Sequence, residues 1–250
     1  MPLRSEPAHK AEQVNQLLFG EKAEVLKVND KDWAYIRCEW DGYEGWCKTG
    51  QLALISRKEY RKAPRYWVAD HYSRFIFEGS EMWLPLGADL FGMSGGKINI
   101  NKSAARFKGK KVNIHKEQAN CETLLAAAHK YMNAPYQWGG RTVAGIDCSG
   151  LIHMAFKLCG RAIPRDASQQ ALQGEVVDFL QHAVCGDLAF FDNPEGKIVH
   201  VGLLLDNERI MHANDASGRV VIDRIDQEGI ISTSLRRRTH HLRVVKRYII

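Results

Sequence analysis

Three residues in the C-terminal half of the chain could perform nucleophilic catalysis together: Cys148, His200 and His212. Cys148 directly precedes residues 149–158, whose apolar side chains recur at helical spacing, so its thiol is predicted to lie at a helix N-terminus. The helix dipole and the unpaired backbone N–H groups there favour the nucleophilic thiolate. The same N–H groups could hold the oxyanion of a tetrahedral intermediate. The alternative is a buried structural cysteine, which is the usual role of a single cysteine.

His200 and His212 lie in two successive apolar runs that predict the strands of a hairpin. One register of this hairpin places Leu205 opposite Arg209. In that register Gly202 lies opposite His212, and His200 is on the same face, two residues away. One imidazole could then accept the thiol proton while the second orients the first. A two-residue turn would shift the register and put the histidines on opposite faces, as ordinary sheet residues.

The ten histidines form no recognisable metal-binding motif. The sequence contains no H-E-x-x-H and no close cluster of Cys and His. His240 and His241 are adjacent in a strand-like run and should point to opposite faces. We therefore expect neither a metal ion nor another cofactor.

The elements that must position these residues change in character near residue 120. Before it, short apolar runs alternate with turn residues, which is typical of small antiparallel β barrels. A charged stretch separates two such units and predicts domains at residues 1–56 and 57–118. After it, helical periodicity is followed by strand-like runs, which predicts an α+β domain over residues 119–250.

The net charge of +6 suggests a nucleic-acid partner until the charge is located. Residues 236–250 contain six Lys or Arg and no Asp or Glu, so the rest of the chain is neutral. This segment is also rich in β-branched residues, which predicts a final strand with solvated charges. We therefore expect no nucleic-acid partner.

The sequence shows no membrane or export signal. Its apolar runs are far shorter than the roughly twenty residues of a membrane span, and the first fifteen residues lack the apolar segment of a signal peptide. The six cysteines form no C-x-x-C pair, which favours free thiols in a reducing compartment, although their even number leaves disulfides open. We expect a cytoplasmic monomer with no membrane contact, or a periplasmic or lipid-anchored protein if a leader peptide has been removed.

Five motifs in the second half of the chain carry a family resemblance. The segments Y-x-W-G-G, D-C-S-G-L, G-D-L-A-F-F, H-V-G-L-L-L and I-M-H-A occur in the order found in NlpC-type cell-wall cysteine peptidases. These enzymes have a papain-like fold, with helices packed on an antiparallel sheet. The resemblance covers about residues 120–250. It implies that Cys148 is the nucleophile, that His200 is the general base and that His212 orients the base.

The start of the chain and the segment D-G-Y-E-G-W resemble the first bacterial SH3 domain of the YkfC-like subgroup. In these γ-D-glutamyl-L-diamino-acid endopeptidases that domain closes one end of the cleft and selects peptides with a free N-terminal L-alanine. The resemblance implies that Asp147, Tyr43 and Glu12 bind this alanine, with Glu6 and Glu44 as rivals of Glu12. The structural alternatives are a helix cap for Asp147, a barrel-surface residue for Tyr43 and a solvated carboxylate for Glu12.

The resemblance implies further substrate contacts as well. Two aromatic residues are expected to line the cleft, and three polar residues resemble D-glutamate contacts. These five residues are Tyr136, Trp138, Ser149, Asp166 and Ser168. The second β unit matches an SH3-like barrel only loosely, and we expect it to have a packing role.

Together the catalytic residues and the family resemblance imply a cysteine endopeptidase. Its expected reaction is hydrolysis of the bond between γ-D-glutamate and a diamino acid, meso-diaminopimelate or L-lysine. The expected substrates are peptidoglycan stem peptides with a free N-terminal L-alanine, and the expected role is murein peptide recycling. One alternative is a wall-peptide-binding module with an inactive peptidase domain. Another is an amidase or acyltransferase on the same scaffold.

Overall fold

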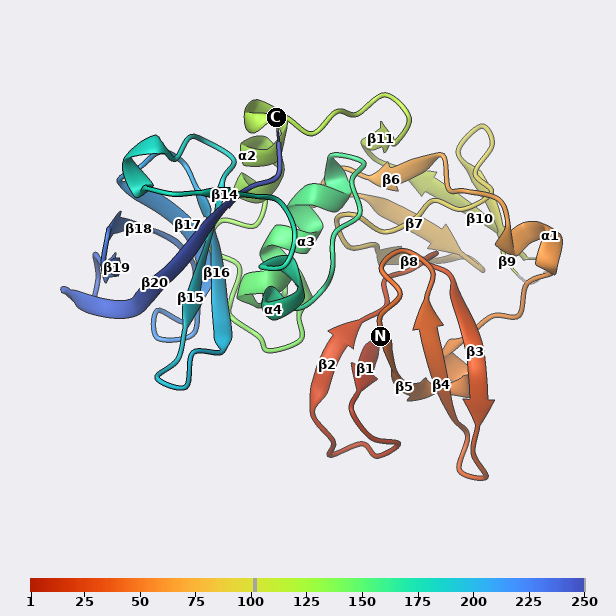
Figure 1. Ribbon diagram of the computed structural model, residues 1–250. Helices are drawn as coiled ribbons and strands as arrows, with labels where there is room; N and C mark the ends of the chain where they lie inside the picture. The colour runs from red at the N-terminus through yellow and green to blue at the C-terminus, as the bar shows by residue number, and fades with distance from the viewer. Residues whose placement is uncertain (101–102, 250) are drawn as a thin grey trace. The chain divides into compact units, whose positions relative to one another are not determined.

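The structure of the protein is a computed structural model that describes residues 1–100 and 103–249 (Figure 1). The chain divides into two units, Met1–Glu117 and Gln118–Ile250. The first unit begins with a five-stranded antiparallel sheet in the order β2-β1-β5-β4-β3. Its strands are β1 (Pro2–Arg4), β2 (Gln13–Gln16), β3 (Ala23–Val28), β4 (Trp33–Cys38) and β5 (Glu44–Lys48), followed by the 3-10 turn η1 (Thr49–Gln51).

Apolar residues on one face of this sheet form its core. In β4, Ala34, Ile36 and Cys38 alternate with more exposed residues, as expected for a strand with one buried face. They pack with apolar residues from the neighbouring strands and from the segment that follows β2, namely Leu3, Leu17 and Cys47. The small antiparallel β unit predicted for the start of the chain is therefore present, although the apolar run at 52–55 forms no strand.

The second part of this unit differs from the expected second SH3-like barrel. It contains α1 (Arg57–Tyr60), β6 (Tyr66–Val68), β7 (Arg74–Phe77), β8 (Ser80–Trp83), β9 (Lys97–Ile100), β10 (Ser103–Lys108) and β11 (Lys111–Asn113). Within the described residues, these strands form a four-stranded sheet, β8-β7-β10-β9, and a separate ribbon of β6 and β11. A second SH3 barrel is therefore not confirmed.

The physical reason lies in how this second part is completed. Its core contains Phe75 and Phe107, and Phe19 from the first part packs against it. The backbone N–H of Asp89 also donates to the carbonyl oxygen of Phe19. The segment thus has its own core, and because Phe19 from the preceding part covers part of it, the strands do not have to enclose that core alone.

The second unit combines helices with a long antiparallel sheet. The helices are α2 (Cys121–His129), α3 (Cys148–Leu158) and α4 (Ala167–Gln170), with the 3-10 turn η2 (Leu180–His182). A short hairpin, β12 (Arg141–Thr142) and β13 (Gly145–Ile146), precedes α3. The sheet has the order β14-β20-β15-β16-β17-β18-β19. Its strands are β14 (Glu175–Val177), β15 (Leu188–Asp192), β16 (Ile198–Leu204), β17 (Arg209–Asn214), β18 (Arg219–Asp226), β19 (Gly229–Ser232) and β20 (Arg237–Arg247).

This sheet closes on itself. The last strand, β20, pairs with β15 on one side and with β19 on the other, so that six strands form a barrel (Figure 1). The predicted antiparallel sheet is therefore present, but as a closed barrel rather than a layer carrying helices on one face. The length of β20, 11 residues, allows it to reach both partners.

The basic final segment forms this closing strand, as the β-branched pattern predicted. Several of its charges have carboxylate partners instead of being only solvated. Arg238 pairs with Asp226, and Arg247 lies 2.7 Å from Asp187. The apparent basic excess is therefore partly balanced within the barrel.

Helix α3 is the central helix of this unit. It contacts α2, β16 and β17, and every residue from Cys148 to Leu158 is buried. The sequence predicted an apolar stripe on one face, but the helix is covered on all sides, including the polar His153 and Lys157.

A disulfide links Cys121, the first residue of α2, to Cys185, which lies just before β15. The free thiols that the sequence favoured are absent at this pair, and the disulfide that the even number of cysteines left open is present. The reason is tertiary, because residues 64 positions apart meet where α2 packs beside the start of the barrel.

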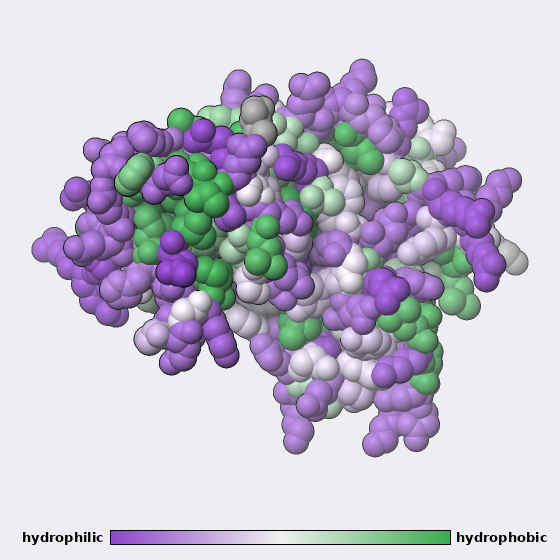
Figure 2. Space-filling view, in the orientation of Figure 1, coloured by the Kyte–Doolittle hydropathy of each residue, from purple (hydrophilic) through white to green (hydrophobic). Residues whose placement is uncertain are grey.

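Hydrophilic side chains cover much of the visible surface, but green hydrophobic patches also reach it on the second unit (Figure 2). The exposed apolar residues of this unit include Leu172, Val176, Phe179 and Val184. Among the helices described, none is long and apolar enough to cross a membrane.

Candidate active site

Cys148 is the first residue of α3, as the sequence predicted. Asp147 is the N-cap: its backbone is extended, and its side chain accepts a hydrogen bond from the N–H of Gly150 at 2.6 Å. The thiol is only slightly exposed and accepts hydrogen bonds from the backbone N–H groups of Ser149 and Val201. Because Val201 follows His200 on β16, the helix start lies directly beside the strand that carries the proposed base.

Glycines allow this helix start to approach the preceding hairpin closely. A Cβ atom at Gly150 would lie 2.3 Å from the carbonyl oxygen of Gly140. A Cβ at Gly140 would in turn lie 2.4 Å from the carbonyl oxygen of Gly145. Side chains at these two positions would push the backbone segments apart. The glycines therefore allow the close packing that fixes the position of Cys148 at the helix start.

A buried ion pair holds Asp147 in place. Its Oδ2 accepts hydrogen bonds from Arg165 Nη2 at 2.7 Å and from the N–H of Gly139 at 2.8 Å. Arg165 also donates to Ser149 Oγ at 2.7 Å. Asp147 is thus a helix cap and an ion-pair partner. Arg165 is not among the site residues predicted from the sequence, although it directly precedes Asp166.

The hairpin of β16 and β17 has the register that brings the two histidines together. Leu204 pairs with Ile210, and the N–H of Leu205 donates to the carbonyl oxygen of Arg209. His200 Nε2 therefore lies 2.9 Å from His212 Nδ1. The predicted register and the shared face of the histidines are both confirmed.

Two residues that the sequence reasoning missed complete this cluster. Asp223 on β18 is buried, and its Oδ2 lies 3.2 Å from His212 Nε2. The ring of His240 on β20 stacks on the ring of His200, with 4.0 Å between centroids and an interplanar angle of 23°. The strand pattern could indicate only that His240 and His241 point apart. Neither contact follows from local spacing, because barrel closure and the β17–β18 register create them.

The pKa shifts favour a neutral thiol and a neutral imidazole. Burial, and then the nearby charge of Asp147, raise the pKa of Cys148 to about 12 against the lowering effect of the two N–H donors. Burial, and then the neighbouring His240 and His212, lower the pKa of His200 well below its usual value. The expectation of a thiolate favoured by the helix terminus is therefore wrong for the unliganded protein. Desolvation of the charge outweighs the helix N–H groups.

The expected cleft residues lie at different depths. Tyr136 is half-buried, and its pKa is raised first by burial and then by the charges of Cys148 and Asp147, which places it near the thiol. Trp138 is 56% exposed. Asp166 is the N-cap of α4, and Ser168 is exposed on that helix, which contacts β16. Ser149 is buried against Arg165, as described above.

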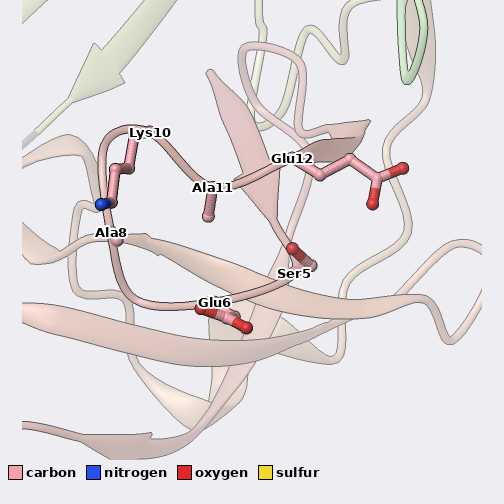
Figure 3. Close-up of a pocket in the computed structure, with 6 residues that line it drawn as sticks. All are labelled: Ser5, Glu6, Ala8, Lys10, Ala11 and Glu12. Carbon is pink, nitrogen blue, oxygen red and sulfur yellow. The ribbon is translucent and has the colours of Figure 1, made fainter.

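The candidate alanine contacts of the first unit differ in their surroundings. Glu6 and Glu12 are exposed and line a pocket of about 250 Å³ in the loop between β1 and β2, where Lys10 and Glu12 extend to opposite sides in the view of Figure 3. Glu44 instead lies 2.7 Å from Arg37. Tyr43 is half-buried and packs against the core of the five-stranded sheet.

No group of three or more His, Cys, Asp or Glu side chains within residues 1–100 and 103–249 is arranged to hold a metal ion. The cluster of Cys148, His200, His212 and Asp223 is instead linked by hydrogen bonds and backbone contacts. Such an arrangement can transfer a proton from a thiol to an imidazole whose orientation is held by a second imidazole.

Comparison with known protein families gives one match in each unit of the chain. The model of the NlpC/P60 family matches residues 133–239, a range that includes Cys148, His200 and His212. The model of the bacterial dipeptidyl-peptidase SH3 domain matches residues 3–52.

Two curated relatives align with most of the chain. Dipeptidyl-peptidase 6 of Lysinibacillus sphaericus is 26% identical over 252 residues, covering 90% of this chain and 89% of that protein. Gamma-D-glutamyl-L-lysine dipeptidyl-peptidase of Bacillus subtilis (strain 168) is 28% identical over 214 residues, covering 79% of this chain and 71% of that protein.

A solved structure shares the fold over nearly the whole chain. The crystal structure of an NlpC/P60 family protein from Bacillus cereus ATCC 10987 superposes with a TM-score of 0.79 at 21% sequence identity, covering 95% of this chain and 83% of that one. This likeness shows the shared fold, and the two family models show that the chain carries a bacterial dipeptidyl-peptidase SH3 domain followed by a domain of the NlpC/P60 family.

Proposed function

We propose that the protein is a cysteine endopeptidase that hydrolyses the bond between γ-D-glutamate and the diamino acid of peptidoglycan stem peptides. The observation that carries this proposal is the 2.9 Å contact between His200 and His212 beside the helix start that holds Cys148. The names of the two curated relatives, a dipeptidyl-peptidase and a gamma-D-glutamyl-L-lysine dipeptidyl-peptidase, support this substrate class.

In the first half of the reaction, the thiol forms a thioester with the substrate. His200 uses Nε2 for its contact with His212, so Nδ1 is the ring nitrogen that accepts the proton of Cys148 Sγ. The resulting thiolate attacks the γ-carbonyl carbon of D-glutamate, and N–H groups at the start of α3 stabilise the oxyanion. The protonated His200 then donates its proton to the nitrogen of the diamino acid, which leaves as an amine.

Water completes the cycle. His200 removes a proton from a water molecule, whose oxygen attacks the thioester carbon. The bond to Cys148 Sγ breaks, the sulfur takes back the proton from His200, and the glutamyl γ-carboxyl group is released. The product from the N-terminal side is L-Ala-γ-D-Glu. Because the resting thiol and imidazole are both neutral, proton transfer accompanies attack rather than preceding binding.

We further propose that the preferred substrates have a free N-terminal L-alanine and arise in murein peptide recycling. Asp147, Tyr43 and Glu12 are the proposed contacts of the alanine ammonium. Tyr136 and Trp138 are proposed to line the cleft. The proposed contacts of D-glutamate are Ser149, Asp166 and Ser168. The diamino acid is meso-diaminopimelate or L-lysine.

Mass spectrometry of L-Ala-γ-D-Glu-meso-diaminopimelate tests the central proposal. The wild-type protein should release L-Ala-γ-D-Glu, and Cys148→Ala should release none. Cys159→Ala removes a second buried thiol, just beyond the other end of α3, and should retain turnover. The lysine tripeptide is tested in parallel.

Three results would contradict the proposal. Turnover by Cys148→Ala above the background rate would exclude Cys148 as the nucleophile. If the wild type leaves both tripeptides intact but binds them, the protein is a wall-peptide-binding module. Hydrolysis of a different amide bond would instead indicate an amidase, and transfer of the L-Ala-γ-D-Glu acyl group to an added amine would indicate an acyltransferase.

A further inference from the structure

We propose that Asp223 is a positioning residue that acts through His212 to select the tautomer in which His200 can accept the thiol proton. The inference deepens the proposed function and rests on it. Asp223 does not touch the thiol in this scheme. It determines which ring nitrogens of the two histidines carry hydrogen.

The strand register places Asp223 beside His212. In the pairing of β17 and β18, His212 lies opposite Val221, so Asp223 is two residues further along the same face. The Asp223 side chain is 2% exposed and that of His212 is fully buried, so water does not compete effectively for their contact. The 3.2 Å separation between Oδ2 and His212 Nε2 is that of a hydrogen bond.

The other oxygen of Asp223 is held separately. Oδ1 accepts a hydrogen bond from the backbone N–H of Thr233 at 2.8 Å. Burial by itself raises the pKa of Asp223, but the hydrogen bonds from His212 and Thr233 outweigh it, and the net shift is downward. At neutral pH the group is therefore a carboxylate, which can only accept hydrogen bonds.

The direction of every hydrogen bond in the cluster follows from this charge. A carboxylate at Oδ2 requires hydrogen on Nε2 of His212, so Nδ1 of a neutral His212 has a lone pair. That lone pair accepts from Nε2–H of His200 across 2.9 Å. Nδ1 of His200 is then without hydrogen, which is the state required to accept a proton from Cys148.

Asparagine at position 223 would reverse the direction of these hydrogen bonds. The N–H of Thr233 requires an acceptor and would hold the amide oxygen, so the NH₂ group would face His212. The amide would then donate to Nε2 of His212, and Nδ1 would carry hydrogen and donate to Nε2 of His200. His200 would consequently have hydrogen on Nδ1 and could not accept the thiol proton. The side chain is nearly unchanged in shape, so this effect is separate from packing.

The experiment combines ¹⁵N NMR of the histidine rings with steady-state kinetics on the tripeptide, for wild type and Asp223→Asn. In wild type, Nε2 of His212 should be protonated and its Nδ1 unprotonated. In Asp223→Asn these assignments should exchange in both histidines. We expect kcat to fall by roughly 10⁴-fold, the loss caused by a wrong histidine tautomer in another enzyme, with KM nearly unchanged.

Asp226→Asn is the matched control. Asp226 lies on the same strand, and its side chain, 44% exposed, pairs with Arg238 instead of with a histidine. This variant should retain the wild-type tautomers and kcat. A purely structural role for Asp223 would make the two variants alike in kcat and in the tautomers, with differences only in stability.

The inference is overturned if Asp223→Asn has wild-type tautomers or a wild-type kcat. If that variant does not fold, the wild-type spectrum decides, because hydrogen on Nδ1 of His212 excludes the proposed chain. The NMR measurement needs no substrate. A wild-type protein with the expected tautomers but no turnover would contradict the proposed function and leave the role of Asp223 in the histidine chain supported.

Discussion

At the residue scale, the central feature is a buried thiol at the start of α3, in contact with the backbone of the strand that carries a buried imidazole. The pKa of Cys148 is raised to about 12, and that of His200 is lowered, because both side chains are buried and a charge on either is poorly solvated. The N–H donors at the helix start reduce the penalty for the thiolate without removing it. The hydrogen-bonded histidines therefore have to accept the proton during the reaction.

The raised pKa predicts how Cys148 responds to alkylation. Because the thiolate is the reactive form, a pKa above the ordinary value means less thiolate at any given pH. Alkylation of Cys148 by iodoacetamide should be slow at pH 7 and should keep increasing as the pH rises beyond 9. Peptide mass spectrometry of the labelled protein across this range provides the measurement.

Cys148→Ser lacks the thiol in question and is the control that measures labelling at all other positions. A plateau of fast labelling below pH 7 would show that the resting thiol is already ionised. In that case the neutral-pair description, and the order of steps derived from it, would be incorrect.

At the element scale, two close backbone approaches form the site. The start of α3 meets the β12–β13 hairpin at glycines, and β16 meets β17 at Gly202. A Cβ at Gly202 would lie 2.6 Å from Ile210 Cδ1 and 3.1 Å from His212 Cβ. The end of an isoleucine side chain can move, but the Cβ of His212 moves only with its strand.

Gly202→Ala should therefore displace His212 relative to His200. We expect unfolding to become easier by about 1–3 kcal/mol from overpacking. We also expect kcat to fall roughly ten- to a hundredfold from misplacement of the base. Urea titration and turnover of the tripeptide measure the two effects.

Gly50→Ala is a suitable control, because a Cβ at Gly50 would have no atom within 4 Å. Gly50→Ala should leave the free energy of unfolding and kcat close to the wild-type values. If Gly202→Ala loses stability but keeps full kcat, the close approach of β16 and β17 serves packing and does not position the base.

At the scale of the whole molecule, the proposed catalytic group lies in one unit, whereas two of the three proposed alanine contacts lie in the other. Cys148, both histidines and Asp223 all lie within Gln118–Ile250, which has its own barrel core. Tyr43 and Glu12 belong to Met1–Glu117. The contributions of Tyr43 and Glu12 to recognition of the free alanine can therefore be tested without altering the catalytic residues.

Acetylation of the N-terminal alanine of the tripeptide is the direct test of that selectivity. If carboxylates bind the alanine ammonium in a desolvated site, loss of its charge leaves them unpaired. We expect kcat/KM to fall by about 2–5 kcal/mol in transition-state free energy. Comparison of Glu12→Gln with Glu6→Gln on both peptides identifies which carboxylate contributes. Equal rates on free and acetylated peptides would refute the proposed selection.

Much of the site could be predicted from sequence because its determinants are local. The helix start at Cys148 follows from a capping Asp147 before a helical apolar pattern. The shared face of His200 and His212 follows from strand periodicity once the hairpin register is chosen.

Only the tertiary structure decided the rest, because it depends on which distant elements meet. Barrel closure through β20 places His240 on His200, and the β17–β18 register places Asp223 on His212. Helix packing against the barrel buries Cys148, which reverses the expected direction of its pKa shift. Local sequence thus determined which chemical groups are present and how their own strands and helix present them. Their solvation and their partners were decided by long-range packing, which local spacing does not encode.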